Sequence, residues 1–164
     1  MNKIQFKHIR FGGISIYIPE QWTTETRMCK DGDSREYSMV EVSTEDGNSS
    51  SFIMTYGLMP SGSDSLLEAG KMYESILGEI GPNPEDDPIR EYDLLGRANA
   101  QAYGFEFHTE DNHVCNYICV PRGSDEQLLT GVGCKLFTVL VTSKTFEDID
   151  NILDMIEDNI YLKP

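Results

Sequence analysis

The sequence has no long apolar run and little positive charge. Its longest mostly apolar stretch, Leu136 to Val141, is only as long as one strand. A transmembrane helix needs about 20 apolar residues, so no membrane span is expected. Acidic residues number 28 and basic residues 13, which gives a net charge of −15 at pH 7. A field of this sign repels phosphate backbones, so nucleic acid is not expected as a partner.

Neither a leader peptide nor a disulfide framework is indicated. The opening residues MNKIQFKHIRFGG have no continuous apolar run and no small-residue cleavage site, so we expect a cytoplasmic protein. The cysteines Cys29, Cys115, Cys119 and Cys134 are then most simply thiols. Cys115 and Cys119 lie in the predicted strand HVCNYICV. Four residues of strand span about 13 Å, whereas a disulfide needs Cα atoms within about 7 Å.

Most of the chain has strand patterns that form pairs around short polar or glycine-containing turns, which predicts hairpins. We expect strands at residues 3–9, 13–19, 35–43, 51–57, 89–95, 98–108, 113–121 and 135–143. With two helices, the predicted order is ββ(β)ββ-α-ββββ-α, in which the bracketed strand is optional.

Two segments have apolar residues at helical spacing. The first begins at Ser65, which forms a capping-box pattern with Glu68, and ends at Gly81–Pro82. The second follows Thr145, the expected N-cap. Its apolar stripe is Phe146, Ile149, Ile152, Leu153, Ile156 and Ile160. Hairpins interrupted by such helices predict an α+β fold, an antiparallel β-sheet flanked by amphipathic helices.

The stretch ISIYIPEQW, residues 14–22, combines an alternating strand with a proline and the only tryptophan. The alternation predicts that its three isoleucines face the core and that Ser15 and Tyr17 are more exposed. Pro19 has no N–H to donate and ends the strand. We expect Trp22 to turn back onto the core and to be mostly buried.

This strand running into IPEQW resembles the start of the PsbP-like family, which includes the photosystem extrinsic protein, the Ran-binding Mog protein and bacterial relatives. The end of the chain, LFTVLVTSKTFEDIDNILDMIEDNI, is similar to the closing strand and helix of that family. The resemblance implies one PsbP-like domain over residues 1–164, with the sheet in an α/β/α sandwich. It implies little about function, because one fold hosts unrelated functions and several family members are binding adaptors.

Two histidines at one hairpin are the candidate metal ligands. His108 and His113 flank the loop TEDN, with Glu106 and Cys115 beside them. A four-residue or a two-residue loop would place all four side chains on one face. Two imidazoles with a carboxylate or a thiolate suit zinc; the alternative is that the histidines are solvent-facing polar residues. The opposite face, expected in the core, carries Tyr103, Phe105, Phe107, Val114 and Ile118.

No motif points to a particular reaction, and we expect no cofactor. The first functional hypothesis is a non-catalytic protein-binding or adaptor domain, for example an immunity protein or an effector chaperone. Its acidic loops Glu45–Ser51 and Glu85–Asp87 would meet a basic or hydrophobic segment of a partner protein. The alternative is a small-molecule- or metal-binding domain, or an enzyme, that uses a cleft between sheet and helix. The sequence does not indicate the oligomeric state.

Overall fold

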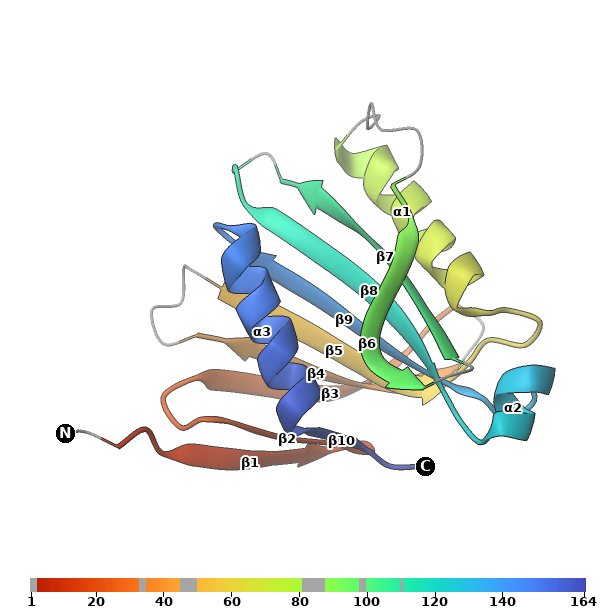
Figure 1. The fold of residues 1–164 in the computed structure, drawn as a ribbon, viewed down its shortest axis with the longest axis horizontal. Coiled ribbons are helices and arrows are strands. Elements are labelled where there is room, and N and C mark those ends of the chain that lie inside the picture. Colours follow the sequence, from red (N-terminus) through yellow and green to blue (C-terminus); the bar gives the residue numbers. More distant parts are fainter. Residues whose placement is uncertain (1–2, 33–34, 45–49, 81–87, 98–99, 110) are drawn as a thin grey trace.

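The computed structural model describes residues 3–32, 35–44, 50–80, 88–97, 100–109 and 111–164, which form two antiparallel sheets and three helices (Figure 1). The larger sheet has the strand order β3-β4-β5-β9-β8-β7-β6 and the smaller one β1-β2-β10. The strands are β1 (Phe6–Phe11), β2 (Ile14–Pro19), β3 (Thr23–Lys30), β4 (Glu36–Ser43), β5 (Ser50–Leu58), β6 (Arg90–Arg97), β7 (Ala100–His108), β8 (Val114–Arg122), β9 (Lys135–Ser143) and β10 (Ile160–Leu162). The predicted sheet-rich α+β class is confirmed.

Two of the helices pack on opposite faces of the larger sheet. Helix α1 (Ser65–Ile80) lies on β7 and β8, whereas α3 (Phe146–Asn159) lies on the other face against β9 and β8 and also contacts β2. The short α2 (Asp125–Thr130) connects β8 to β9. In Figure 1 the end of α3 runs directly into β10 at the bottom of the molecule. No helix in the described ranges is long and apolar enough to cross a membrane.

Each face of the larger sheet has its own apolar core. The larger core lies between the sheet, α3 and the smaller sheet, and includes the fully buried Ile16, Phe52 and Ile156. The second core lies under α1, where Tyr73 meets the buried ring of Phe105 edge-on at 5.3 Å between centroids. Burial of each large apolar side chain stabilises the fold by about 1.5–3 kcal/mol, so the central strands are anchored from both sides.

The predicted burial pattern of residues 14–22 is confirmed. The three isoleucines of β2 are at most 1% exposed, whereas Tyr17 is 50% exposed. Gly12 and Gly13 form the turn with φ of 54° and 91°, which glycine adopts without strain. Trp22 is more than half buried, as predicted, and packs edge-on against Phe52 with ring centroids 6.3 Å apart.

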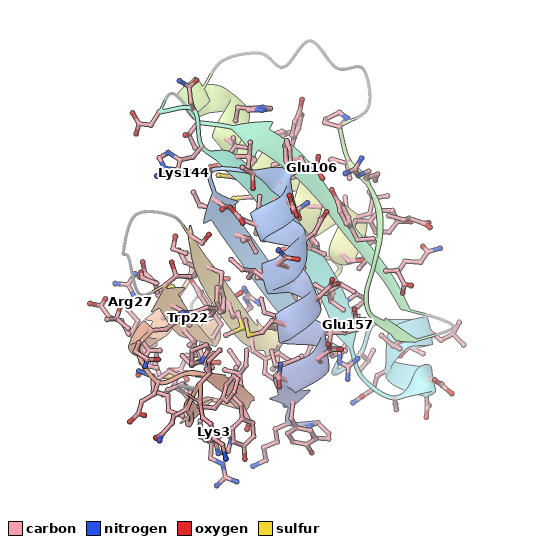
Figure 2. All side chains as sticks on the ribbon, turned by 60° about the vertical axis from the view of Figure 1, so that its left-hand side comes forward. Lys3, Trp22, Arg27, Glu106, Lys144 and Glu157 are labelled. Carbon is pink, nitrogen blue, oxygen red and sulfur yellow. The ribbon has the colours of Figure 1, made fainter. Side chains whose placement is uncertain are left out.

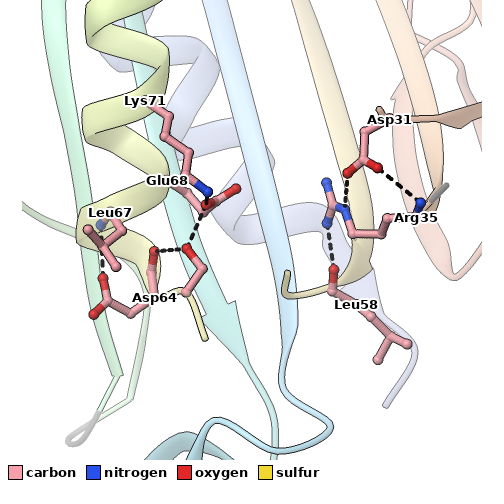
Figure 3. Close-up of polar contacts among 8 residues, drawn as sticks. Asp31, Arg35, Leu58, Asp64, Leu67, Glu68 and Lys71 are labelled. Atoms are coloured by element: carbon pink, nitrogen blue, oxygen red, sulfur yellow. Dashed lines mark hydrogen bonds and ion pairs between the residues drawn. The ribbon is translucent and has the colours of Figure 1, made fainter. Parts of the chain in front are cut away.

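One predicted helix cap is confirmed and the other is wrong. Thr145 is the N-cap of α3 and accepts the Asp148 N–H at 3.1 Å. In α1, however, Asp64 is the capping residue, since its Oδ1 accepts the Leu67 N–H at 2.8 Å (Figure 3). Ser65 is already the first helical residue. The predicted helix stop at Gly81–Pro82, the loop at Glu85–Asp87 and residues 45–49 lie outside the described residues.

Two short elements, α2 and β10, differ from the prediction. The optional strand is present as β3. Helix α2 was missed because it has six residues and none is buried, so it has no apolar stripe; its Ser124–Gln127 capping box was the available signal. Ile160, assigned to the last helical stripe, instead begins β10, which pairs with β2.

Gly104 and Gly70 give a matched test of this packing. A Cβ at Gly104 would lie 2.0 Å from the Tyr117 carbonyl oxygen, whereas one at Gly70 meets no atom within 4 Å. Gly104→Ala should therefore destabilise the protein by about 3 kcal/mol, and Gly70→Ala should stabilise α1 by about 0.5–1 kcal/mol. Urea unfolding measures both values. A Gly104→Ala variant as stable as the wild type would show that β7 and β8 are not paired as described.

Candidate functional site

The hairpin that carries the predicted metal ligands has a register that the sequence analysis did not anticipate. His108 pairs with Val114 instead of His113, so the connection is one residue longer than a four-residue loop. A shift of one residue reverses the face to which a side chain points. Cys115 therefore lies on the α1 side of the sheet, whereas Glu106 and His108 lie on the α3 side. The prediction that the four side chains share one face was wrong.

The hairpin residues that were predicted to share one core face lie on two different faces of the sheet. The aromatic Phe105 and Phe107 pack under α1, whereas Val114 and Ile118 belong to the core under α3. Both faces of this hairpin are covered, because each has a helix over it. Because both faces are apolar, the sequence pattern of these two strands does not show which residues share a face.

The predicted ligands have other contacts. His108 is exposed, with its ring edge-on to Phe146 at 5.7 Å between centroids, and Glu106 Oε1 pairs with Arg90 Nη2 at 2.6 Å. Cys115 is buried. Within the described residues, no three His, Cys, Asp or Glu side chains lie close enough together to hold a metal ion. The zinc hypothesis assumed that these side chains share one face, and the register of the hairpin does not support that assumption.

A small hollow lies where α1 begins, next to β7 and the end of β8. It has a volume of about 240 Å³, and its lining includes Asp64, Ser65, Gln101 and Tyr103. Its polar groups bind one another: Ser65 Oγ donates to the Gln101 carbonyl and Tyr103 OH to Gln101 Oε1, both at 2.8 Å. Asp64 is the cap of α1. The hollow therefore gathers groups that are already satisfied, unlike a typical substrate site.

The four cysteines are free thiols, and Cys115 and Cys119 are not joined, as the strand spacing predicted. Burial raises the pKa of the Cys119 thiol to about 12 and also raises the pKa of Cys115 and Cys134. A thiol must lose its proton to become a nucleophile. These three thiols therefore stay protonated, and are weak nucleophiles, at neutral pH.

The free edge of β6, at one side of the larger sheet, is blocked. Its register with β7 breaks between Tyr92 and Arg97, and Leu95 has a positive φ of 56°. The Leu95 N–H donates to Glu157 Oε1 and its carbonyl accepts from Arg122 Nη1, each at 3.2 Å. Bulges and occupied backbone groups are common ways of protecting an edge strand.

The free edge of β3, at the other side, has none of these protections. It pairs with β4 in unbroken register over eight residue pairs, contains no proline, and has no buried residue. In the same register, the Asp31 N–H donates to the Arg35 carbonyl at 3.0 Å. Hydrogen-bonded pairs alternate along an antiparallel ladder. The backbone groups of Thr24, Thr26 and Met28 therefore point away from β4, toward the open edge.

The sheet face beside β3 is also open. Helix α1 covers β7 and β8, and in the described part of the chain no helix packs on this face of β4 and β5. Met39 and Ile53 are only half-buried there. Glu25 and Glu41 lie directly opposite each other in register, an arrangement of like charges that destabilises a sheet. Figure 2 shows Arg27, also on β3, at the outer side of the molecule, away from α3.

This surface is the part of the structure that the sequence analysis left undefined. The segment TTETRMCK lacks alternation of apolar and polar residues, because neither of its faces is buried. The available signal was its threonine content, since β-branched residues favour strands.

Replacing Cys119 should change how stability depends on pH. Its folded pKa of about 12 lies above the ordinary value of 9.0. The native thiol therefore keeps a proton that the unfolded chain releases. The contribution of the Cys119 thiol to the free energy of unfolding is fully present below pH 9. It is lost as the pH rises toward 12, at up to about 1.4 kcal/mol per pH unit. Urea unfolding between pH 8 and 11 should give a flatter curve for Cys119→Ala than for wild type or for Cys29→Ala, a half-buried control. Parallel curves for all three would contradict the expectation.

Removing the charge of Glu25 should stabilise the protein. Glu25→Gln ends the repulsion with Glu41 and should raise the free energy of unfolding by about 0.2–1 kcal/mol, with a smaller gain at high salt. Glu36→Gln is the matched control, because Glu36 pairs with Lys30 at 3.7 Å and its loss brings no such gain. Urea titration at two salt concentrations tests both, and a Glu25→Gln variant less stable than wild type refutes the repulsion.

Comparison of the chain with protein-family models, with curated proteins and with solved structures finds no match. Its function is therefore inferred from its own surfaces.

Proposed function

We propose that the chain is a non-catalytic protein-binding domain that takes up an extended segment of its partner as an additional strand beside β3. The observation that carries this proposal is the regular, unprotected edge of β3. Addition of a strand to an exposed sheet edge is a recurring mode of peptide recognition. In that mode backbone hydrogen bonds provide affinity and the flanking side chains provide specificity.

The backbone geometry supplies the first part of the interaction. The outward-facing groups of Thr24, Thr26 and Met28 form a row of donors and acceptors at the spacing of a sheet ladder. Each hydrogen bond contributes about 0.5–1.5 kcal/mol net. Because β4 already holds β3 in an extended conformation, β3 loses little conformational entropy when a partner binds.

The side chains favour a partner segment that is both basic and apolar. A lysine or arginine beside Glu25 would relieve its repulsion with Glu41. On the other face of β3, Met28 is 57% exposed and offers an apolar contact. The net charge of −15 speeds the approach of a basic segment, an effect that weakens as salt is added.

We further propose that residues 1–164 form one PsbP-like domain, an α/β/α sandwich. Support comes from the strand entering IPEQW and from the packing of α1 and α3 on opposite faces of one antiparallel sheet. An immunity protein or an effector chaperone would be an instance of such a domain with a protein-binding role.

An enzyme or a metal-binding domain is supported less well by the same residues. The buried thiols are neutral, the hollow at the start of α1 contains polar groups that bind one another, and His108 lies on the face opposite Cys115. A protein-binding surface needs none of these groups.

The substitution Thr26→Pro should block binding without unfolding the protein. Thr26 directs its N–H to the open edge, where proline is tolerated within sheets, but proline removes a donor and its ring obstructs an added strand. Thr26→Val keeps the N–H and serves as the matched control. Peptides selected on the wild-type protein from a displayed ten-residue library should be rich in Lys and Arg among apolar residues. They should bind Thr26→Val as tightly as wild type and Thr26→Pro at least about tenfold more weakly.

Hydrogen exchange locates the contact directly. A bound peptide should slow exchange at the amides of Thr24, Thr26 and Met28. Thermal unfolding confirms that Thr26→Pro is folded; if it is not, Thr24→Pro makes the same test at another outward-facing position. Equal binding to the proline variant, or unchanged exchange at these three amides, would rule out strand addition.

A further inference from the structure

Two cations are held side by side at one end of the sheet. Arg122, at the end of β8, and Lys135, at the start of β9, are direct partners in register. Like charges directly opposite each other destabilise a sheet. Both side chains are half-buried, which reduces the screening of their repulsion by water.

Neither cation forms an ion pair within the described part of the chain, although the sequence is rich in acidic residues. The ion pairs found there are Lys30–Glu36, Asp31–Arg35, Glu68–Lys71 and Arg90–Glu106. Arg122 Nη1 donates to the Leu95 carbonyl at 3.2 Å, and Lys135 Nζ lies 5.3 Å from the centroid of the Tyr56 ring. Glu157 accepts the Leu95 N–H instead of pairing with Arg122.

Arg122 and Lys135 line a hollow of about 290 Å³ at the edge of the larger core, where β8 ends and β9 begins. Tyr56 and Leu162 supply apolar walls, and the lining is completed by Gly123, Ser124, Gln127, Gly133 and Pro164. Ser124 Oγ accepts the Gln127 N–H at 3.2 Å, so its own hydroxyl proton is left to donate. No Asp or Glu is among these lining residues.

We propose that this hollow is a binding site for a small oxyanion, a carboxylate or phosphate group held between Arg122 and Lys135. The anion would cancel the repulsion between the two cations. Arg122 keeps donors beyond the one used by Leu95, and a guanidinium suits the paired oxygens of such a group. The volume of about 290 Å³ lies just below the usual range for ligand sites, about 300–1,000 Å³, which limits the ligand to a small molecule such as inorganic phosphate or a short-chain carboxylate.

The neighbouring charges favour the same ligand class. Arg10 and Lys163 line a second hollow of about 500 Å³ on the outer face of the smaller sheet. Lys135 Nζ, which lines the first hollow, also donates to the carbonyl of Lys163, which lines the second, at 3.5 Å. The residues that line the two hollows therefore include four cations and no Asp or Glu, which favours small anions.

Thermal unfolding in phosphate, butyrate and chloride at constant ionic strength tests the site. A ligand that binds only the folded state raises Tm by mass action, by about 5–10 °C at a free concentration of about 100 Kd. We expect a saturable rise in wild type with phosphate or with butyrate, relative to chloride. Lys144→Gln, which changes an exposed lysine outside the hollow (Figure 2), should keep this rise. Lys135→Gln and Arg122→Gln should lose it.

The comparison among variants separates the site from general salt effects, because phosphate stabilises many proteins by exclusion from their surfaces. If Arg122→Gln does not fold, Lys135→Gln still decides the outcome. A rise with phosphate alone identifies a phosphate site, and a rise with butyrate alone identifies a carboxylate site with an apolar tail. Equal Tm values in all three salts, or a rise that Lys135→Gln retains in full, overturns the proposal. None of these outcomes tests peptide binding at β3, so the two proposals can fail independently.

Discussion

The register of the antiparallel ladder through β5, β9 and β8 is the constraint on which the rest of the structure depends. Because side chains alternate between faces, this register decides which residues lie under α1 and which lie under α3. Phe52, Val141 and Asn116 follow one another across the three strands on the α3 side, and Ile53, Leu140 and Tyr117 do so on the other side. Apolar burial on both faces fixes the register more firmly than one covered face could.

A fixed register also fixes where charges meet. Among the strand pairs that the structure describes, two set like charges directly opposite each other: Glu25 with Glu41, and Arg122 with Lys135. The first lies on the open face beside β3 and the second in the hollow at the end of β8 and the start of β9. Each pair costs stability in the free protein, and a ligand of opposite charge would remove that cost. Both proposed sites therefore rest on the same physical reason, a pair of like charges across two strands, which is acidic at β3 and basic at β8 and β9.

The sequence predicted the elements whose amphipathic pattern is strong, and it failed where the pattern is weak or two-sided. The isoleucines of β2 and the stripe of α3 as far as Ile156 were placed correctly, because each covers a single core. The predicted shared face of His108 and Cys115 was wrong, because a one-residue difference in loop length reverses the face of the second strand and both faces of that hairpin carry apolar residues. The edge of β3 was undefined because an unburied strand has no periodic signal, so the proposed binding surface could be seen only after its neighbours were placed.

An unprotected edge strand normally invites pairing between copies of the same chain. Here a second copy would bring another net charge of −15 toward the first and would place further carboxylates beside Glu25 and Glu41. Repulsion of this kind disfavours self-association without a proline or a bulge in β3. A basic extended segment meets no such barrier. The acidic composition and the open edge therefore act together: the charge restricts the partners of the edge, and the backbone geometry provides the hydrogen bonds for those that remain.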